Sequence, residues 1–337
     1  MFPTEKYNMP FWDGVRKGWY EVWYSKFNDP KKRIGVWLRY TFLVPYEGHG
    51  TPSYGVWGIF FDRGNPSNNR AYKHIGPIGE LALDRERFAI HVPCGSMTQE
   101  RQTGEVAGDG GGGIEWDLKM VPSTELYSHM PKIIYRSPLP RSKALSPNLS
   151  VPFTGTVRVD GRGYSFDGAP GHQSHHWGTK LPYRWAWANC NSFRERADAF
   201  LEAASGTYNE IGVETPVFST FMVRLGGQDY HFGWKRNLLD HTTVFNENGW
   251  EVRAENRTHV LMFNIKSSPA GTVCACYTDP DCERKFCHNN TVADAGVRLF
   301  KKNASGRLEL VQQLTSDGTC AFEVAQPDKI PGIPVCI

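Results

Sequence analysis

Apolar residues alternate with other residues in short runs along most of this 337-residue chain. The clearest runs cover Trp19–Tyr24, Ile34–Val44 and Tyr54–Phe61, and turn residues such as Asn28-Asp29-Pro30 separate them. A period of two puts successive side chains on opposite faces of a β-strand, whereas an amphipathic helix needs a period of about 3.6. Short strands joined by tight turns are typical of an antiparallel meander. The chain is therefore predicted to be all-β, and its 11 Trp, 14 Tyr and 19 Phe residues suit sheet surfaces.

The same rhythm continues to the end of the chain and indicates two β units of similar size. Further strands are predicted at residues 81–92, 114–120, 151–159, 183–190, 217–225, 228–235, 250–253, 259–266, 296–301, 308–314 and 319–324. Residues 194–204 could form the one helix, because Ala197, Phe200 and Ala204 have helical spacing. Residues 108–113 are predicted to be a hairpin tip, and residues 137–152 a surface crossing. The two units are predicted to be residues 1–178 and 179–337, divided near Gly178.

Charge and hydropathy argue against several classes of function. The formal net charge is +3, and the one tight basic run, Lys31-Lys32-Arg33, is predicted to be a solvated turn rather than a nucleic-acid patch. No apolar stretch approaches the ~20 residues of a membrane-spanning helix, although peripheral membrane contact stays open. The first six residues lack the apolar core of a secretion signal, so a cytoplasmic location is expected. The glycines at residues 108–113 lack the Gly-Lys-Ser/Thr that a phosphate-binding loop requires.

Eight cysteines are expected to be reduced thiols, as is usual in a cytoplasmic compartment. They are Cys94, Cys190, Cys274, Cys276, Cys282, Cys287, Cys320 and Cys336. The later ones include a dense group, C-x-C-x5-C-x4-C-H, which leaves zinc and disulfide alternatives open. Its spacing differs from the paired C-x2-C knuckles of zinc sites, so structural thiols are favoured and no metal is predicted. If this segment begins with a strand, Cys274 and Cys276 share a face.

The densest group of chemically versatile side chains lies in residues 161–191, GRGYSFDGAPGHQSHHWGTKLPYRWAWANCN. In its last part Trp185, Trp187 and Asn189 are spaced by two, so they share one face of a predicted strand. Two indoles beside an amide can form a cavity wall, in which the amide fixes the polar end of a ligand. The alternative is an ordinary core face, with Asn189 bonded to the backbone.

Three of the 11 histidines, His172, His175 and His176, also lie in this segment. Imidazole titrates near neutral pH and suits acid–base catalysis. It is also a common metal ligand, but the segment is predicted to be a Gly/Pro loop, and no suitable third ligand accompanies the histidines. Structural hydrogen bonding within a loop is the third interpretation.

The order of these motifs resembles a known superfamily. Gly161-x-Gly163-Tyr164, then His172-Gln173-x-His175-His176-Trp177-Gly178, then Trp185-x-Trp187 together resemble the central signature of the carotenoid hydratase (hydroxyneurosporene synthase), tocopherol cyclase and AttH-like superfamily. The opening segment Trp19–Phe42 and the later Tyr277-x-Asp279-Pro280 are also similar to it. The resemblance implies two consecutive lipocalin-like units, each an antiparallel β-barrel or sandwich, with at most one or two short helices.

The resemblance also implies cofactor-independent cyclisation, hydration or isomerisation of an apolar isoprenoid- or polyketide-like molecule, chemistry typical of secondary metabolism. We therefore lean towards a lyase- or isomerase-type enzyme with no cofactor, whose partner is a small apolar ligand. The expected catalytic residues are His175, His176 and Asp167, and the expected substrate contacts are His172, Trp177, Tyr164, Trp185, Trp187 and Asn189. Hydratases of the superfamily carry an acidic residue where Ser174 stands here, so His175 or His176 would have to supply the proton.

Two other functions fit the same residues. A non-catalytic carrier of a lipid or pigment needs the aromatic pocket but no titrating group. A structural or partner-binding β protein needs neither. Turnover of a bound ligand would exclude the carrier, and a deep cavity lined by aromatic side chains would count against the structural protein.

Overall fold

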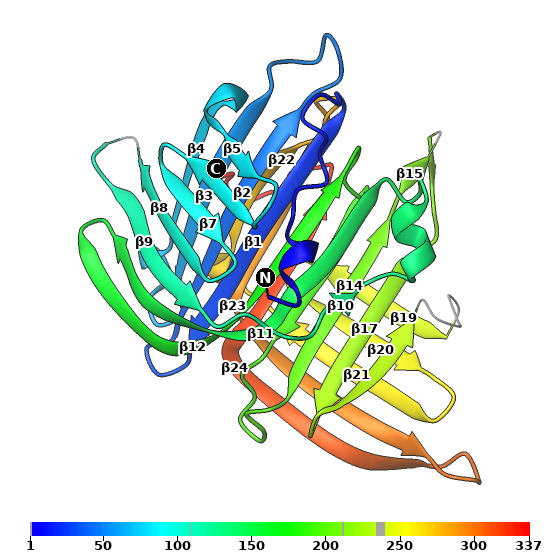
Figure 1. Cartoon of the computed structure of the whole chain (residues 1–337). Coiled ribbons are helices and arrows are strands. Elements are labelled where there is room, and N and C mark those ends of the chain that lie inside the picture. Colours follow the sequence, from blue (N-terminus) through cyan, green and yellow to red (C-terminus); the bar gives the residue numbers. More distant parts are fainter. Residues whose placement is uncertain (1, 109, 211, 234–239) are drawn as a thin grey trace.

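Two antiparallel sheets contain nearly all of the regular structure (Figure 1). The computed structural model describes residues 2–108, 110–210, 212–233 and 240–337. Strands make up 61% of the chain, helices make up 5%, and no described helix reaches seven residues. The prediction of an all-β chain is therefore confirmed. The helices are short 3₁₀ turns: η1 (Glu5–Tyr7), η2 (Pro66–Asn68), η3 (Ile78–Glu80), η4 (Lys132–Arg136) and η5 (Pro269–Gly271).

The first sheet has twelve strands, all from the first half of the chain. They are β1 (Trp19–Asp29), β2 (Ile34–Val44), β3 (Ser53–Asp62), β4 (Arg70–Pro77), β5 (Ala82–Asp84), β6 (Ala89–Val92), β7 (Gly95–Thr98), β8 (Arg101–Ala107), β9 (Gly113–Met120), β10 (Tyr127–Ser128), β11 (Ser142–Val159) and β12 (Arg162–Gly178). Their order is β4-β3-β2-β1-β12-β11-β9-β8-β7-β6-β5, and β10 pairs with β11.

The second sheet has ten strands and begins after the connection at residues 179–183. The remaining strands are β13 (Arg184–Cys190), β14 (Phe200–Thr207), β15 (Asn209–Glu210), β16 (Val213–Glu214), β17 (Phe218–Leu225), β18 (Gln228–Gly233), β19 (His241–Asn246), β20 (Gly249–Glu255), β21 (His259–Lys266), β22 (Val273–Thr278), β23 (Arg284–Lys302) and β24 (Leu308–Gln326). The order is β18-β17-β14-β13-β24-β23-β21-β20-β19, β22 pairs with β23, and β15 and β16 form a separate hairpin. That residues 1–178 and 179–337 fold as separate units stays a prediction.

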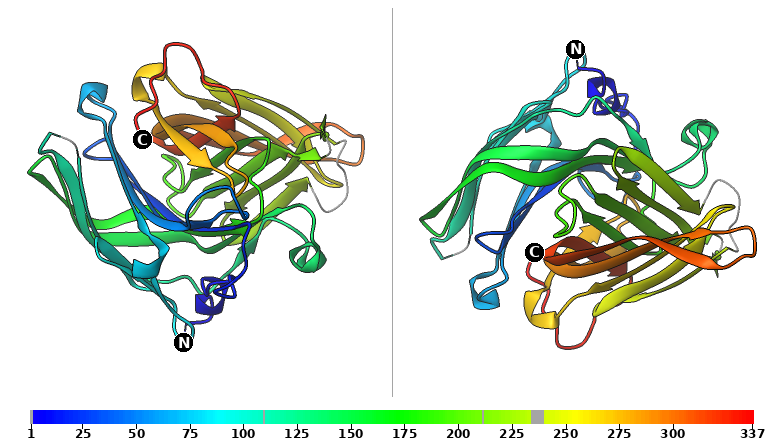
Figure 2. Two further views of the ribbon diagram at one scale, coloured as in Figure 1. Left: turned by 90° about the horizontal axis from the view of Figure 1, so that it is seen from above. Right: turned by 90° about the horizontal axis from the view of Figure 1, so that it is seen from below.

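Figure 2 shows the two curled sheets lying against each other. Apolar side chains form three main layers, one inside each sheet and one between the two sheets. Strand β1 contributes to two of them because its side chains alternate between its faces. Trp23 and Phe27 pack inside the first sheet, whereas Tyr20 and Tyr24 belong to the layer between the sheets. This middle layer also contains Trp187 of β13. Because both faces of these central strands are buried, the strands hold side chains in fixed positions between the two sheets.

Three local predictions were wrong, and strand context explains each. Residues 137–152, predicted to be a surface crossing, mostly form the buried start of β11. The segment that contains His172 and His176, predicted to be a Gly/Pro loop, is part of β12, whose pairing with β11 contains irregularities that accommodate such residues. Residues 194–204 contain no helix, and the segment ends in β14, which is buried on both faces. Burial on both faces fills a strand with apolar residues and hides the period of two.

Candidate functional site

A cavity of about 510 Å³ lies between the two sheets. The first half contributes Tyr20, Val22, Tyr24, Trp37, Arg39, His129 and His176, together with residues of the 130–144 segment. The second half contributes Trp185, Trp187, Ala204, Ser205, Tyr208, Phe218, Tyr277 and Glu323, among others. The walls are mainly aromatic and aliphatic, and a few polar groups converge on them, as is usual in sites for small apolar ligands.

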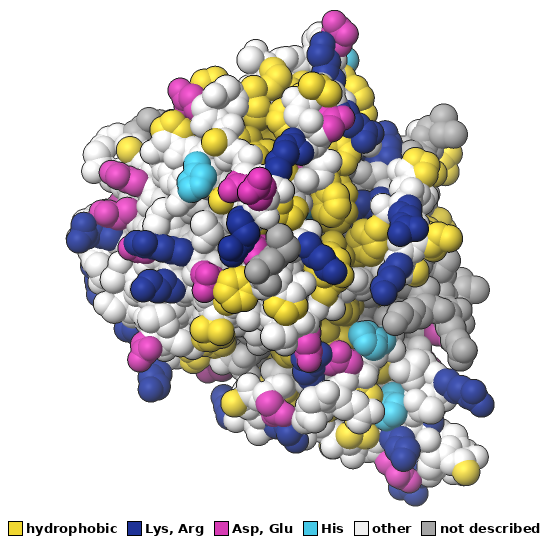
Figure 3. Space-filling model, viewed as in Figure 1, with side chains coloured by type: hydrophobic (Ala, Val, Ile, Leu, Met, Phe, Trp, Pro, Cys, Tyr) yellow, Lys and Arg dark blue, Asp and Glu magenta, His cyan; other side chains and the backbone are white. Residues whose placement is uncertain are grey.

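One rim of the cavity is formed by η4 and the residues that follow it. Ile134, Leu139 and Pro140 line the cavity, and Leu139 is also 52% exposed. The cavity therefore reaches the surface along this segment. Figure 3 shows apolar side chains, flanked by Lys and Arg side chains, over the part of the molecule where η4 and β15 lie in Figure 1.

Three of the predicted site residues, His176, Trp185 and Trp187, line the cavity. The ring of His176 meets that of Tyr24 edge-on, with 5.1 Å between centroids, and burial holds the pKa of this imidazole well below 6.5. Trp187 also meets Tyr24 edge-on at 5.3 Å, and Trp185 stacks on Tyr277 at 6.1 Å. A neutral imidazole and several aromatic faces therefore border the same space.

Two further predicted residues, His172 and Asn189, are buried and are not among the cavity-lining residues. The ring of His172 lies 5.5 Å from that of Trp187, and Nδ1 of His172 is 3.4 Å from Nδ2 of Asn189. Asn189 donates to a carboxylate oxygen of Glu202 at 2.8 Å. These residues form a polar layer beside the cavity wall.

The remaining predicted residues lie elsewhere, and for His175 and Trp177 the reason is that β12 alternates its side chains between two faces. His175 and Trp177 point into the first sheet, where the His175 ring stacks on Trp23 at 4.6 Å and its Nε2 lies 2.8 Å from a carboxylate oxygen of Glu21. Tyr164, near the start of β12, packs on Phe60. Asp167 is exposed on the same strand. None of these four residues is among those that line the cavity.

Glu323 of β24 was not predicted, yet among the described cavity-lining residues it is the only carboxyl group. It lies beside Trp187 in the sheet, and its Oε1 accepts a hydrogen bond from Nδ2 of Asn289 at 2.7 Å. Burial raises the pKa of this carboxyl to about 7, although the positive charge of Arg39 acts to lower it. A substantial fraction of the Glu323 carboxyl is therefore protonated at neutral pH.

Glu202 of β14 is a second buried carboxyl that was not predicted. Trp187 donates its indole N–H to Oε1 of Glu202 at 2.8 Å, and Nε2 of His129 lies 3.4 Å from the same oxygen. Burial raises the pKa of Glu202 to about 8 and lowers the pKa of His129 to about 4. Both groups are therefore mainly neutral near pH 7, and their approach is a neutral contact rather than an ion pair.

Both glutamates interrupt apolar runs, Ala199-Phe200-Leu201-Glu202-Ala203 and Cys320-Ala321-Phe322-Glu323-Val324. A carboxylate within a buried strand is costly unless it is paired or protonated, so such a residue points to a site. This was the signal available in the sequence. The sequence pattern does not reveal the strand order β14-β13-β24. In this order the strands that carry Glu202 and Glu323 flank the strand that carries Trp187.

One hydrogen-bond donor on the cavity wall, Nε of Arg39, has no partner among the described residues, whereas the indole of Trp37 interacts with the Glu323 carboxyl. The Arg39 guanidinium lies against both Tyr277 and Trp57, with its carbon 4.2 Å and 4.7 Å from the two ring centroids. Buried donors normally find an acceptor. An oxygen atom of a ligand is the kind of acceptor that this donor suits.

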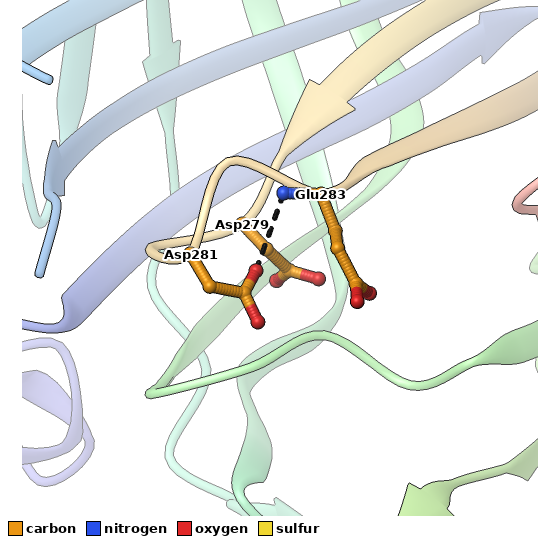
Figure 4. Close-up of side chains that lie close together, drawn as sticks. All are labelled: Asp279, Asp281 and Glu283. Carbon is orange, nitrogen blue, oxygen red and sulfur yellow. Dashed lines mark hydrogen bonds between the residues drawn. The ribbon is translucent and has the colours of Figure 1, made fainter. Parts of the chain in front are cut away.

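Three acidic side chains meet at the turn between β22 and β23 (Figure 4). Oxygens of Asp279, Asp281 and Glu283 lie within 4.8 Å of one another. Nζ of Lys180 lies 2.5 Å from Asp281 and 2.9 Å from Glu283, and Asp279 accepts from the backbone N–H of Leu181 at 2.7 Å. The cluster therefore joins this turn to the segment that connects the two sheets.

The cysteine-rich stretch forms this β22–β23 hairpin. Cys274 and Cys276 pack in one small apolar cluster, whereas Ala275 and Cys287 belong to the layer between the sheets. This confirms the predicted shared face of Cys274 and Cys276. All eight cysteines are free thiols in the structure.

The buried Glu202 carboxyl leads to a prediction about stability. Its pKa is higher in the folded protein than the ordinary value of 4.5, so its contribution to the free energy of unfolding is fully present below about pH 4.5 and is lost as the pH rises through about 8. We expect Glu202→Gln to reduce the loss of stability over this range by on the order of 5 kcal/mol. Urea denaturation at several pH values would measure it. The exposed Glu251, changed to Gln, is the control, and parallel pH profiles for the wild type and Glu202→Gln would contradict the prediction.

Comparison with known proteins identifies relatives of this chain. A model of the tocopherol cyclase-like family matches residues 150–326, more than half of the chain. A probable chloroplastic tocopherol cyclase of Oryza sativa subsp. japonica is 24% identical over 177 residues, which are 51% of this chain and 37% of the rice protein. For a chloroplastic tocopherol cyclase of Zea mays the identity is 25%, over 51% of this chain and 36% of the maize protein. The match thus spans little more than a third of the length of these plant proteins.

Longer matches cover most of the chain. An uncharacterized protein of Mycobacterium tuberculosis is 23% identical over 300 residues, 88% of this chain and 85% of that protein. A putative AttH from Nitrosomonas europaea has a similar fold, with a TM-score of 0.55 and 10% identity over 92% of this chain and 93% of the other. Kievitone hydratase from Nectria haematococca gives a TM-score of 0.51 and 10% identity, over 91% and 88% of the two chains. The fold and the family resemblance agree, and the chain belongs to the tocopherol cyclase-like family.

Proposed function

We propose that this protein is an enzyme that protonates an alkene of an apolar isoprenoid- or polyketide-like molecule and then adds oxygen to it. The observation that carries the proposal is the buried carboxyl of Glu323, whose pKa burial raises to about 7, in a cavity walled by aromatic side chains. Relatives named tocopherol cyclase and a structural neighbour named kievitone hydratase support chemistry of this class. Ring closure and hydration share the first step and differ in the source of the oxygen.

Glu323 would act as the general acid. Its O–H bond breaks as the proton adds to one alkene carbon, which leaves a cation at the other carbon and a carboxylate on Glu323. A phenolic or alcoholic O–H of the same molecule, or a water molecule, then forms the C–O bond. The proton released from that oxygen returns to Glu323 or passes to the neutral imidazole of His176, which lines the same cavity. No oxidant, reductant or cofactor enters this balance.

The aromatic walls suit the charge that develops in this reaction. Faces of Tyr and Trp rings attract cations through their quadrupoles, most strongly where water is excluded. Tyr24, Trp185, Trp187 and Tyr277 all line the cavity. A tight pocket also holds a flexible chain folded, with its oxygen close to the cation, which favours ring closure.

The unpartnered Nε–H of Arg39 would hold the oxygen-bearing head of the substrate near Glu323. The apolar tail would then extend along the wall towards the rim at η4. In this arrangement Trp185 and Trp187 contact the substrate directly, as expected from the sequence. His172 and Asn189 support the wall by holding Trp187 and Glu202 in place.

The direct test is turnover in deuterium oxide. The protein would be incubated with a prenyl hydroquinone, and the products would be analysed by mass spectrometry and proton NMR. We expect a product with one deuterium bound to carbon, because the carboxyl of Glu323 exchanges its proton with the solvent before it protonates the alkene. Binding of the prenyl hydroquinone and of a panel of prenyl phenols and polyenes without any carbon-bound deuterium would identify a carrier instead.

Filling the cavity should prevent binding. Ala204 lines the cavity, and an indole introduced by Ala204→Trp would occupy space that the ligand needs. We expect the affinity for a prenyl hydroquinone, measured by quenching of tryptophan fluorescence, to fall about tenfold or more. Val244→Trp, at a position 68% exposed on β19, should bind as the wild type does. Unchanged affinity of Ala204→Trp would place the ligand outside this cavity.

A further inference from the structure

The rim segment, residues 131–141, combines exposed aliphatic side chains with positive charge. Ile133 is 76% exposed, and Leu139 is 52% exposed although it also lines the cavity. Large aliphatic groups in water are unfavourable, and a group of them at the mouth of a cavity marks an interaction site. The same segment contains Lys132, Arg136 and Arg141, and the chain has no acidic residue between Glu125 and Asp160.

The local backbone places these groups on the outside together. Residues three apart share a face in a 3₁₀ helix, so Ile133 and Arg136 of η4 project from one side. Ile134, between them in sequence, lines the cavity instead. The Tyr135 hydroxyl donates to the backbone oxygen of Ala144 at 2.7 Å and ties η4 to β11. The turn therefore holds an apolar side chain and a cation outward beside the opening.

We propose that residues 131–141 dock this protein on an anionic lipid surface, with the cavity mouth facing the lipid. Ile133 and Leu139 enter the boundary between head groups and acyl chains, and Lys132 and Arg136 contact the anionic head groups. An apolar substrate then passes from the lipid into the cavity without crossing water. The identity of the substrate rests on the proposed function, whereas the docking on lipid does not. None of the described helices is long and apolar enough to cross a membrane.

The test is sedimentation of the full chain with vesicles, in the absence of substrate. Vesicles of equimolar phosphatidylglycerol and phosphatidylcholine should carry the protein into the pellet, and vesicles of phosphatidylcholine alone should not. Added salt should weaken binding, because it screens the lysine and arginine charges. We expect Ile133→Asp, and separately Lys132→Glu with Arg136→Glu, to lower vesicle affinity about tenfold or more. Leu310→Asp, at an aliphatic position on β24 that is 55% exposed, is the matched control and should bind normally.

Two results would overturn the proposal. One is wild-type protein that stays in the supernatant with the anionic vesicles, and the other is Ile133→Asp protein that binds as tightly as the wild type. If Ile133→Asp instead abolished self-association in sedimentation equilibrium while vesicle binding was absent, the segment would be an interface with a second copy. Turnover of a prenyl hydroquinone dispersed in detergent tests the proposed chemistry without vesicles, so the two proposals fail separately.

Discussion

Replacement of Glu323 by Gln is expected to lower turnover of the alkene substrate by about 10²- to 10⁴-fold, the usual contribution of a positioned general acid. The amide keeps the shape of the side chain but has no acidic proton to give to the alkene. In the wild type, turnover should fall as the pH rises through about 7, because burial raises the pKa of Glu323 to that value and only the protonated carboxyl is active. The variant should lose this dependence together with its activity. Rates of carbon-bound deuterium incorporation at several pH values would measure both effects.

The matched control is Glu202→Gln, which changes the other buried carboxyl beside Trp187. Glu202 is not among the cavity-lining residues, so this variant should retain much more activity than Glu323→Gln. Unchanged affinity for a prenyl hydroquinone in both variants would show that the cavity is intact. A Glu323→Gln variant with at least half of the wild-type rate would exclude Glu323 as the proton donor and direct attention to His176.

Replacement of Glu21 by Ala should destabilise the fold by about 3–5 kcal/mol, the cost of removing one partner from a buried charged network. Glu21 is fully buried, and its carboxylate accepts from the backbone N–H groups of Phe11 and Trp12, at 2.7 and 3.0 Å. It also lies 2.8 Å from Nε2 of His175 and accepts from the indole of Trp19 at 3.2 Å. Alanine leaves these donors without an acceptor inside the protein. Urea denaturation would give the free energy of unfolding.

Glu47→Ala is the control for this stability measurement, because the Glu47 side chain is 87% exposed and its pairing with Lys17 at 3.5 Å contributes little. Hydrogen exchange at Phe11 and Trp12 gives a second readout, since their backbone N–H groups should lose protection in Glu21→Ala. A Glu21→Ala protein within about 1 kcal/mol of the wild type would contradict this account of the network. It would also weaken the view that His175 has a structural role.

Much of the fold could be predicted from the sequence wherever a strand has two unlike faces. In β2 and β3 alternation and turn residues were clear, and the predicted strands agree with the structure within a residue or two. The pattern failed in β14, where both faces are buried, and in β12, where glycine and proline lie inside a long bent strand. Part of the strand predicted at residues 228–235 falls outside the described residues, and residues 228–233 form β18.

The candidate site divides in the same way. Trp185, Trp187 and Asn189 could be placed on one face because that depends only on neighbours in sequence. Which histidine lines the cavity depends on which alternate residues of β12 point towards it. This could not be assigned while the segment was predicted to be a loop. Glu323 meets Trp187 only through pairing of β24 with β13, a contact between residues far apart in the chain. No local pattern encodes that pairing.

Because the cavity lies between the two sheets, any ligand in it contacts both halves of the chain. Neither half encloses the space by itself, because each supplies one wall. A ligand that binds only this assembled form stabilises it by mass action, by about 2.7 kcal/mol at a free concentration one hundred times its dissociation constant. The bound substrate would thus stabilise the association of the two sheets as well as react. Partial separation of the two sheets would let the product leave. A ligand bound in the cavity would oppose that separation.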